Sequence, residues 1–158
     1  MKVSDAKKIT GSLTRTSKMP GLSYSLPAWE CKTGSKLRKI KGSVCASCYA
    51  LKGNYTRYKA IKAAQYDRLN KIYDPRWIAG MVAQIIRQKY FRWHDAGDIQ
   101  SIQHLRAIFS VCIRTPETQH WMPTREAQFL KQVKPEEVPE NLIIRMSSHM
   151  VDQGPVNF

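Results

Sequence analysis

The sequence predicts an α/β fold with a mainly parallel sheet, shaped as a partial (half) βα barrel or as a small open sheet. Three observations predict it. Short segments rich in aromatic and β-branched residues alternate with segments whose apolar residues recur every three or four positions. Helical segments lie between four consecutive strand-like ones, which is the connection that parallel pairing requires. With 158 residues and 42% hydrophobic content, the chain is long enough for one proper core.

The N-terminal part of the chain is expected to differ from the rest. Residues 1–20 are polar and basic and show no hydrophobic periodicity, so we expect a flexible arm, followed by a single α/β domain over residues 21–158. The first strand is "GLSYSLPA", in which small or polar residues alternate with apolar ones until Pro27. A cysteine-bearing loop with three glycines then extends from Trp29 to about Asn54.

The later elements are predicted from apolar stripes and from residues typical of helix starts. Asp74 and Pro75, for example, are typical of an N-cap and of a first helical position. The predicted helices cover residues 58–72, 74–86, 99–113 and 126–133. The predicted strands after the first cover residues 90–94, 119–126 and 141–148.

Positive charge is concentrated in the first half of the chain. The net charge is +14, and residues 1–72 contain 16 Lys and Arg against 3 acids, whereas residues 73–158 contain 10 against 9. A one-sided basic field of this size is typical of a protein with a polyanion partner, most often nucleic acid; a solubilising surface is the alternative. The expected nucleic-acid-binding residues are the cations of the cysteine loop, Lys32, Lys36, Arg38, Lys39 and Lys41.

The sequence favours a location in the cytoplasm. No apolar run approaches the roughly 18 residues that a membrane span needs, and the basic N-terminus lacks the apolar segment of a secretory signal. In a reducing compartment, clustered cysteines are more often metal ligands or reactive thiols than disulfides.

Three of the four cysteines lie close together in the sequence. Cys31 precedes Cys45 and Cys48, which lie in "GSVCASCYALKGNY". Three thiolates on such a loop can bind a soft metal and leave one metal position open. The alternatives are an iron–sulfur cluster, a zinc ion completed by His94 or another donor, and plain thiols or a disulfide. Cys112 lies on the apolar face of a predicted helix, so we expect it in the core.

Polar residues follow the predicted strands, at the edge where parallel α/β sheets bind ligands. The turn "HDAGD" could bind the amine of a small cofactor, hydrogen-bond a ribose or complete a metal shell. Alternatively it is an Asx-type turn whose acids cap the next helix. Arginines at the neighbouring strand ends would attract a carboxylate or phosphate, or form structural salt bridges. The candidate cofactor-binding residues are His94, Asp95, Gly97, Asp98, Arg125, Arg145 and Ser147, whereas His104 and His120 are expected at or near the surface.

Four blocks of the chain resemble the phage gene-product-88 family. They read "KMPGLSYSLPAWECKTG", "GSVCASCYALKGNY", "FRWHDAGDIQS" and "HWMPTRE", within a match from Lys18 to Ser148. The resemblance implies a phage protein that acts in the cytoplasm of an infected bacterial cell. The family has no established activity, so the resemblance implies no particular reaction.

The cysteine loop is more loosely similar to the cluster loop of radical S-adenosylmethionine enzymes. That similarity implies a [4Fe–4S] cluster on Cys31, Cys45 and Cys48. It also implies that the open iron binds the amino and carboxylate groups of S-adenosylmethionine close to the turn 94–98. The chain differs from the common pattern in having 13 residues between the first two cysteines and an aromatic residue after the last one. It also lacks a Gly-Gly-Glu-like run after the second strand.

Together these features predict a phage-type iron–sulfur protein that acts on nucleic acid or a nucleotide. The alternative is a non-enzymatic, metal-stabilised protein that binds nucleic acid or inhibits the host. Formation of a homo-oligomer or binding of a protein partner is compatible with both.

Overall fold

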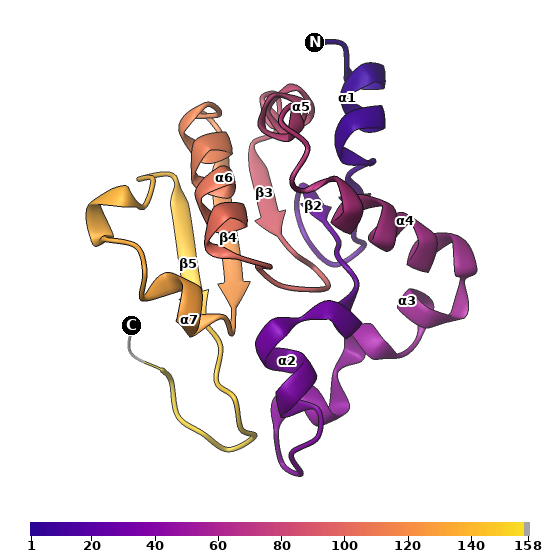
Figure 1. Cartoon of the computed structure of the whole chain (residues 1–158), viewed down its shortest axis with the longest axis vertical. Helices are drawn as coiled ribbons and strands as arrows, with labels where there is room; N and C mark the ends of the chain where they lie inside the picture. The colour runs from indigo at the N-terminus through magenta and orange to yellow at the C-terminus, as the bar shows by residue number, and fades with distance from the viewer. Residues whose placement is uncertain (157–158) are drawn as a thin grey trace.

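Five strands form one sheet in the order β1-β2-β3-β4-β5 in the computed structural model, which describes residues 1–156 (Figure 1). The mainly parallel sheet and its four predicted strands are confirmed, because only β1 is antiparallel to its neighbour. A half barrel is not confirmed, and the sheet has two edges, at β1 and β5. The strands are β1 (Thr14–Arg15), β2 (Leu22–Tyr24), β3 (Tyr90–Trp93), β4 (Gln119–Thr124) and β5 (Leu142–Met146).

Helices form the connections between the parallel strands. The predicted helices are confirmed with shorter bounds as α4 (Lys59–Lys71), α5 (Trp77–Ile85), α6 (Ile102–Ile113) and α7 (Ala127–Leu130). The cysteine loop contains short helices that were not predicted: η1 (Ala28–Glu30), α2 (Lys32–Leu37), η2 (Val44–Ser47), η3 (Tyr49–Leu51) and α3 (Asn54–Arg57). A last short turn, η4 (Pro135–Glu137), precedes β5. Within residues 1–156, no helix has the length and apolar character needed to cross a membrane.

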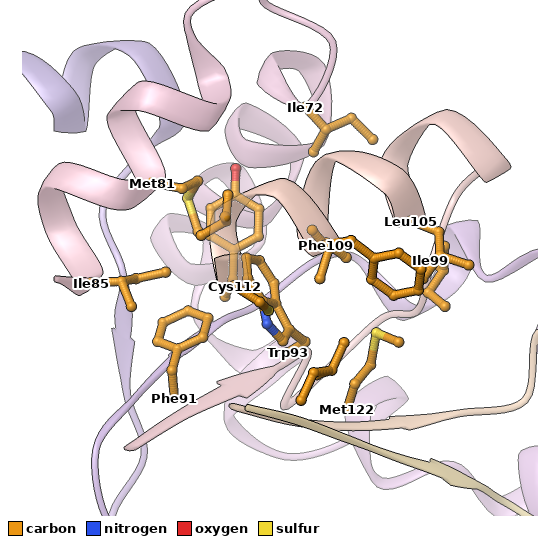
Figure 2. Packing of buried hydrophobic residues seen from close by; sticks show 14 of the residues in the cluster. Ile72, Met81, Ile85, Phe91, Trp93, Ile99, Leu105, Phe109, Cys112 and Met122 are labelled. Atoms are coloured by element: carbon orange, nitrogen blue, oxygen red, sulfur yellow. The ribbon is translucent and has the colours of Figure 1, made fainter. Parts of the chain in front are cut away.

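The main core is formed by side chains from the sheet and from helices α5 and α6. Figure 2 shows Met81 of α5 with Phe109 and Cys112 of α6, together with Trp93 of β3 and Met122 of β4. Full burial of one such apolar side chain stabilises a fold by roughly 1.5–3 kcal/mol. The prediction that Cys112 is a core residue is confirmed, because its exposed fraction is 0%.

The expectation that His104 and His120 lie at or near the surface is wrong, because both are buried. The indole Nε1 of Trp93 donates to Nδ1 of His120 at 3.2 Å. The other ring nitrogen of His120, Nε2, lies 2.8 Å from Oγ1 of Thr115. Burial lowers the pKa of His120 to about 4 and that of His104 well below its usual value. Both rings are therefore neutral at pH 7 and pack as aromatic core residues.

Residues 1–20, expected to be a flexible arm, contain α1 (Val3–Thr10) and β1 instead. Helix α1 packs closely on α5, because a Cβ on Gly80 would lie only 2.6 Å from Cγ2 of Thr10. The side chain of Gln84 donates to Oγ1 of Thr10 at 2.6 Å. Only two small side chains of α1, Ala6 and Thr10, are buried, so the buried side of this short helix is narrow.

Helix α6 is capped by Ser101 and not by Asp98, which was the alternative interpretation of the turn 94–98. Oγ of Ser101 accepts a hydrogen bond from the backbone N–H of His104 at 3.0 Å, the usual N-cap contact, worth about 1 kcal/mol. The carboxylate of Asp98 binds groups at the sheet edge instead, which removes it from the helix end.

Candidate functional site

The carboxyl ends of the parallel strands lie at one edge of the sheet. In Figure 1 the arrows of these strands point towards the end of the molecule that holds α2 and the cysteine-bearing segment. This segment follows β2, the turn 94–98 follows β3, residues 124–126 follow β4 and residues 147–148 follow β5. Most of the predicted site residues therefore lie in one region.

Two of the three clustered cysteines, Cys31 and Cys45, lie beside Gly34. A Cβ built on Gly34 would lie 3.5 Å from Sγ of Cys45 and 3.8 Å from Sγ of Cys31. Cys31 and Cys48 in turn pack against the same small cluster of three buried alanines. The absence of a side chain on Gly34 thus leaves a space towards which two of the thiols converge, with the third nearby.

These thiols are not already arranged around a metal ion. Within residues 1–156, no group of three or more His, Cys, Asp or Glu side chains has an arrangement that could hold one. All four cysteines are free, so the disulfide alternative is not formed. Metal binding by Cys31, Cys45 and Cys48 would therefore require their side chains to move, and their thiolates suit a soft metal.

The surroundings of Cys31 and Cys45 favour the neutral thiol. Burial is the main cause that raises the pKa of Cys31, and the charges of Asp98 and Cys48 raise it further. Burial also raises the pKa of Cys45, while the positive charge of Arg125 acts in the opposite direction. A bound metal would therefore have to displace protons from these thiols.

Asp98 links the end of β3 to the end of β4. Its Oδ1 accepts hydrogen bonds from the backbone N–H of Ile99 at 2.8 Å and from Oγ1 of Thr124 at 2.5 Å. Its Oδ2 accepts from the backbone N–H of Arg125 at 2.9 Å. Burial raises the pKa of Asp98 to about 6, although these three donors lower it. The carboxyl group therefore connects the segment that follows β3 to the segment that follows β4.

Glu126 attaches helix α2 to the end of β4. Its Oε1 accepts from the backbone N–H of Thr33 at 2.7 Å, and its Oε2 accepts from Oγ1 of Thr33 at 2.8 Å. Nε2 of Gln128 also donates to Oε2 at 2.9 Å. Because Thr33 lies two residues after Cys31, this fully buried glutamate fixes the first cysteine relative to the sheet.

Asp95 holds the second half of the cysteine-bearing segment. Its Oδ1 accepts from Oγ of Ser23 at 2.6 Å, and its Oδ2 accepts from the hydroxyl of Tyr55 at 2.9 Å. The hydroxyl of Tyr49, the residue after Cys48, donates to the backbone carbonyl of Asp95. The carboxylate is thus used to join the segment to the ends of β2 and β3.

His94 and Gly97 have special backbone conformations in the same turn. His94 has φ of 65°, and its Nδ1 lies 2.9 Å from the carbonyl oxygen of Tyr24, while its Nε2 is buried without a partner among the described residues. Burial lowers the pKa of His94 to about 4. Gly97 has φ of 81°, and a Cβ there would lie 2.5 Å from Cβ of Leu26. Only glycine fits at this close approach.

The other candidate residues after β4 and β5 differ in position. Nε of Arg125 donates to the carbonyl oxygen of Ser148 at 3.0 Å, and the guanidinium lies near Cys45, since it lowers the pKa of that thiol. The backbone N–H of Ser147 donates to the carbonyl oxygen of Thr124 and extends the β4–β5 pairing. Arg145 is exposed on β5, and its side chain forms no hydrogen bond with another described residue.

The loop cations lie on α2 and in the turn after it. Four are exposed, Arg38 is half-buried, and none of the five forms an ion pair with another described residue. They are Lys32, Lys36, Arg38, Lys39 and Lys41.

Several positioning residues were not predicted from the sequence. The cysteine-bearing segment is held by side chains of Thr33, Tyr49 and Tyr55. The occurrence of two tyrosines soon after Cys48 is the one local signal that could have indicated the role of Tyr49 and Tyr55. The chain after β5 also returns to this segment, where the backbone N–H of Val44 donates to the carbonyl oxygen of His149 at 2.9 Å.

Comparison with known proteins places the chain in a family but gives no activity. The profile of the gene product 88 family matches residues 1–155. No curated protein and no solved structure matches the chain. The looser likeness to radical S-adenosylmethionine enzymes receives no support from these comparisons.

Proposed function

The chain belongs to the gene product 88 family, a phage protein family, and for this member we propose an iron–sulfur protein that acts on nucleic acid or a nucleotide. In this proposal Cys31, Cys45 and Cys48 bind one [4Fe–4S] cluster at the carboxyl ends of the parallel strands. The observation that carries it is the space beside Gly34, towards which the sulfurs of Cys31 and Cys45 converge.

The residues around the cysteines have distinct roles in this proposal. Glu126 and Thr33 fix the start of α2, so that Cys31 is held against the sheet edge. Arg125 supplies positive charge beside Cys45 and offsets part of the negative charge of three thiolates. When bound, the cluster supplies one-electron chemistry and an open iron position for the amine and carboxylate of S-adenosylmethionine.

Topology supports this proposal in one respect. Strands β2 to β5 are consecutive and parallel, and the cysteines follow the first of them. When consecutive parallel strands are joined by crossover connections of the same handedness, the connecting helices lie on one face of the sheet. A half βα barrel has the same arrangement.

A non-enzymatic protein with a structural metal is the second candidate. The carboxylates of Asp95, Asp98 and Glu126 all accept internal hydrogen bonds. These groups therefore position loops and are poorly available as acids or bases. In this candidate a zinc ion takes the three thiolates and one further donor, and the protein binds nucleic acid or inhibits the host.

Anaerobic reconstitution with iron and sulfide, compared with zinc alone, distinguishes the two candidates. The iron–sulfur proposal predicts a brown protein that contains iron and sulfide, loses its colour in air, and binds S-adenosylmethionine in calorimetry. A colourless protein that takes up one zinc per chain and binds no S-adenosylmethionine would contradict it and favour the structural metal.

The loop cations support nucleic acid as the partner, because none of them forms an ion pair with a residue of 1–156 and they lie on the segment that contains the cysteines. Their attraction to phosphates releases condensed counterions, so binding of mixed DNA or RNA should weaken steeply as salt rises. Replacement of Lys36, Arg38, Lys39 and Lys41 together by Gln should lower the affinity and flatten this salt dependence. Metal content should stay unchanged. Equal binding of nucleic acid by the variant and the parent would exclude the loop cations as the nucleic-acid-binding surface.

A further inference from the structure

We propose a nucleotide pocket beside Cys31, an inference that rests on the proposed function because it assigns the substrate of that site. An open pocket of about 370 Å³ lies between residues of α2 and α7, and Cys31 forms part of its wall. This volume is within the range of about 300–1,000 Å³ that is typical of small-molecule sites. The cavity is therefore large enough for one nucleotide next to the proposed metal ligand.

Two glutamines in the wall provide hydrogen-bond acceptors for a base. Gln100 has an exposed fraction of 7%, and its Nε2 donates to the carbonyl oxygen of Asp98 at 2.9 Å. Nε2 of Gln128 donates to the carboxylate of Glu126, also at 2.9 Å. Both partners are acceptors, so each amide is oriented with its nitrogen towards the protein. No described residue donates to Oε1 of either glutamine, and these oxygens suit the amino group of a nucleobase.

Aromatic and cationic side chains complete the wall. Trp29 and Phe129 line the cavity, and Nζ of Lys62 lies 4.5 Å from the centre of the Trp29 ring. Base stacking on an aromatic side chain contributes about 1–3 kcal/mol. Lys32 and Lys36 also line the cavity and can bind a phosphate.

The carboxylate of Glu30 leaves the net charge of the wall positive, because Lys32 and Lys36 outnumber it. Glu30 is the one acid among the described lining residues, and its Oε1 accepts a hydrogen bond from the hydroxyl of Tyr66 at 3.1 Å. No ion pair joins Glu30 to a cation in residues 1–156. The two lysines therefore remain available to an anion.

Aromatic rings, amide acceptors and two ammonium groups together fit a nucleotide whose base carries an amino group. The base belongs either to a free nucleotide or to a single strand, because a paired base in a duplex is stacked and cannot enter such a cavity. Both sources share one chemistry, so the experiment includes both.

Binding is measured by calorimetry on the full chain with AMP, CMP, GMP, UMP and ribose 5-phosphate, and with a short single strand and its duplex. Nucleotides with an amino group should bind about tenfold more tightly than UMP or ribose 5-phosphate, and the single strand should bind more tightly than the duplex. Equal binding of all five small ligands, or of single strand and duplex, would overturn the pocket.

Two pairs of variants test the named side chains. Trp29→Leu should weaken AMP binding about tenfold, whereas Trp121→Leu, at an exposed tryptophan on β4, should not. The double variant Lys32→Gln with Lys36→Gln should also weaken AMP binding. The control double variant Lys7→Gln with Lys8→Gln, which removes the same charge from α1, should have no effect. Helices α1 and α2 lie at opposite ends of the molecule (Figure 1). AMP binding that survives both sets of pocket changes would contradict the assignment.

Metal content is measured on the same samples, so that the two proposals fail separately. A protein that binds its metal but no nucleotide would exclude the nucleotide pocket and would still agree with the proposed metal centre. A protein that binds AMP but no metal would exclude the metal centre and leave the pocket without its proposed reaction.

Discussion

Gly34 is the residue on which the approach of the thiols most directly depends. It lies inside α2 with no unusual backbone angle, where alanine would be favoured over glycine by roughly 0.5–1 kcal/mol. Its Cβ position, however, lies 3.0 Å from Cβ of Cys31 and 3.5 Å from Sγ of Cys45. A glycine here therefore costs helix stability and leaves room beside the thiols.

Substitution Gly34→Ala should separate metal binding from stability. The added methyl group occupies the space between the thiols, so we expect the metal content of anaerobically prepared protein to fall to less than half. The free energy of unfolding of the metal-free protein should stay within about 1 kcal/mol of the parent, because the gain in helix propensity offsets the tight contact. Gly154→Ala is the control, since no atom lies within 4 Å of that Cβ. Full metal content in Gly34→Ala would contradict this role.

Asp98 shows what the sequence could not predict at the scale of single residues. Its place after a strand indicated a role at the sheet edge, and the structure places it there. Its partners Thr124 and Arg125 lie 26 and 27 residues further along the chain. Only the pairing of β3 with β4 brings these groups together. From the neighbouring sequence alone, the N-terminus of α6 was the nearest candidate partner for the carboxylate of Asp98.

At the scale of elements, the position of α2 depends on one buried carboxylate. Glu126 accepts two hydrogen bonds from Thr33 in the first turn of α2. Short helices in isolation are unstable in water, so α2, with six residues, needs such tertiary contacts to persist. The contact between the β4 end and α2 therefore fixes the segment that contains Cys31.

Substitution Glu126→Gln should loosen α2. The amide places an N–H₂ group against a donor, which should lower the free energy of unfolding by about 1–3 kcal/mol. Hydrogen exchange should speed up in residues 32–37 more than in α6. Glu140→Gln, at an exposed glutamate, is the matched control. If exchange in residues 32–37 were as slow in Glu126→Gln as in the control, α2 would be held by other contacts.

Most elements could be predicted, but their ends and the first helix could not. Strands β3 to β5 and helices α5 and α6 have clear periodicity, because each buries one side against the core. In helix α4 the buried residues are the polar Gln65 and Arg68. Helix α1 buries only Ala6 and Thr10, and its packing depends on Gly80 of a distant helix. The short helices of the cysteine loop lack an apolar stripe, and contacts such as those of Glu126 and Asp95 determine their positions.

At the scale of the whole molecule, buried neutral histidines make the fold sensitive to acid. Burial lowers the pKa of His94 and of His120 to about 4 and lowers that of His104 well below its usual value. In the unfolded chain these groups have a pKa of about 6.5. The unfolded state therefore binds protons first as pH falls, and stability is lost as the pH drops from about 6.5 towards 4.

We expect the metal-free protein to lose about 2 kcal/mol of stability for each of His94 and His120 between pH 7 and pH 5. Asp98 acts in the opposite direction, because its raised pKa of about 6 favours the folded state at low pH and offsets about 1 kcal/mol of the loss. Urea unfolding at several pH values measures the net change. In His120→Gln, proton uptake on unfolding at pH 5 should fall by about one proton. Stability that is constant between pH 7 and pH 5 would show that the buried rings are not neutral.

The most direct test of the whole account is the metal content of four single cysteine variants prepared without oxygen. We predict one metal centre per chain in the parent, its loss in Cys31→Ala, Cys45→Ala and Cys48→Ala, and its retention in Cys112→Ala, whose thiol is buried in the main core. Undiminished metal content in Cys45→Ala, or loss of metal in Cys112→Ala alone, would contradict the proposal that Cys31, Cys45 and Cys48 form the functional centre.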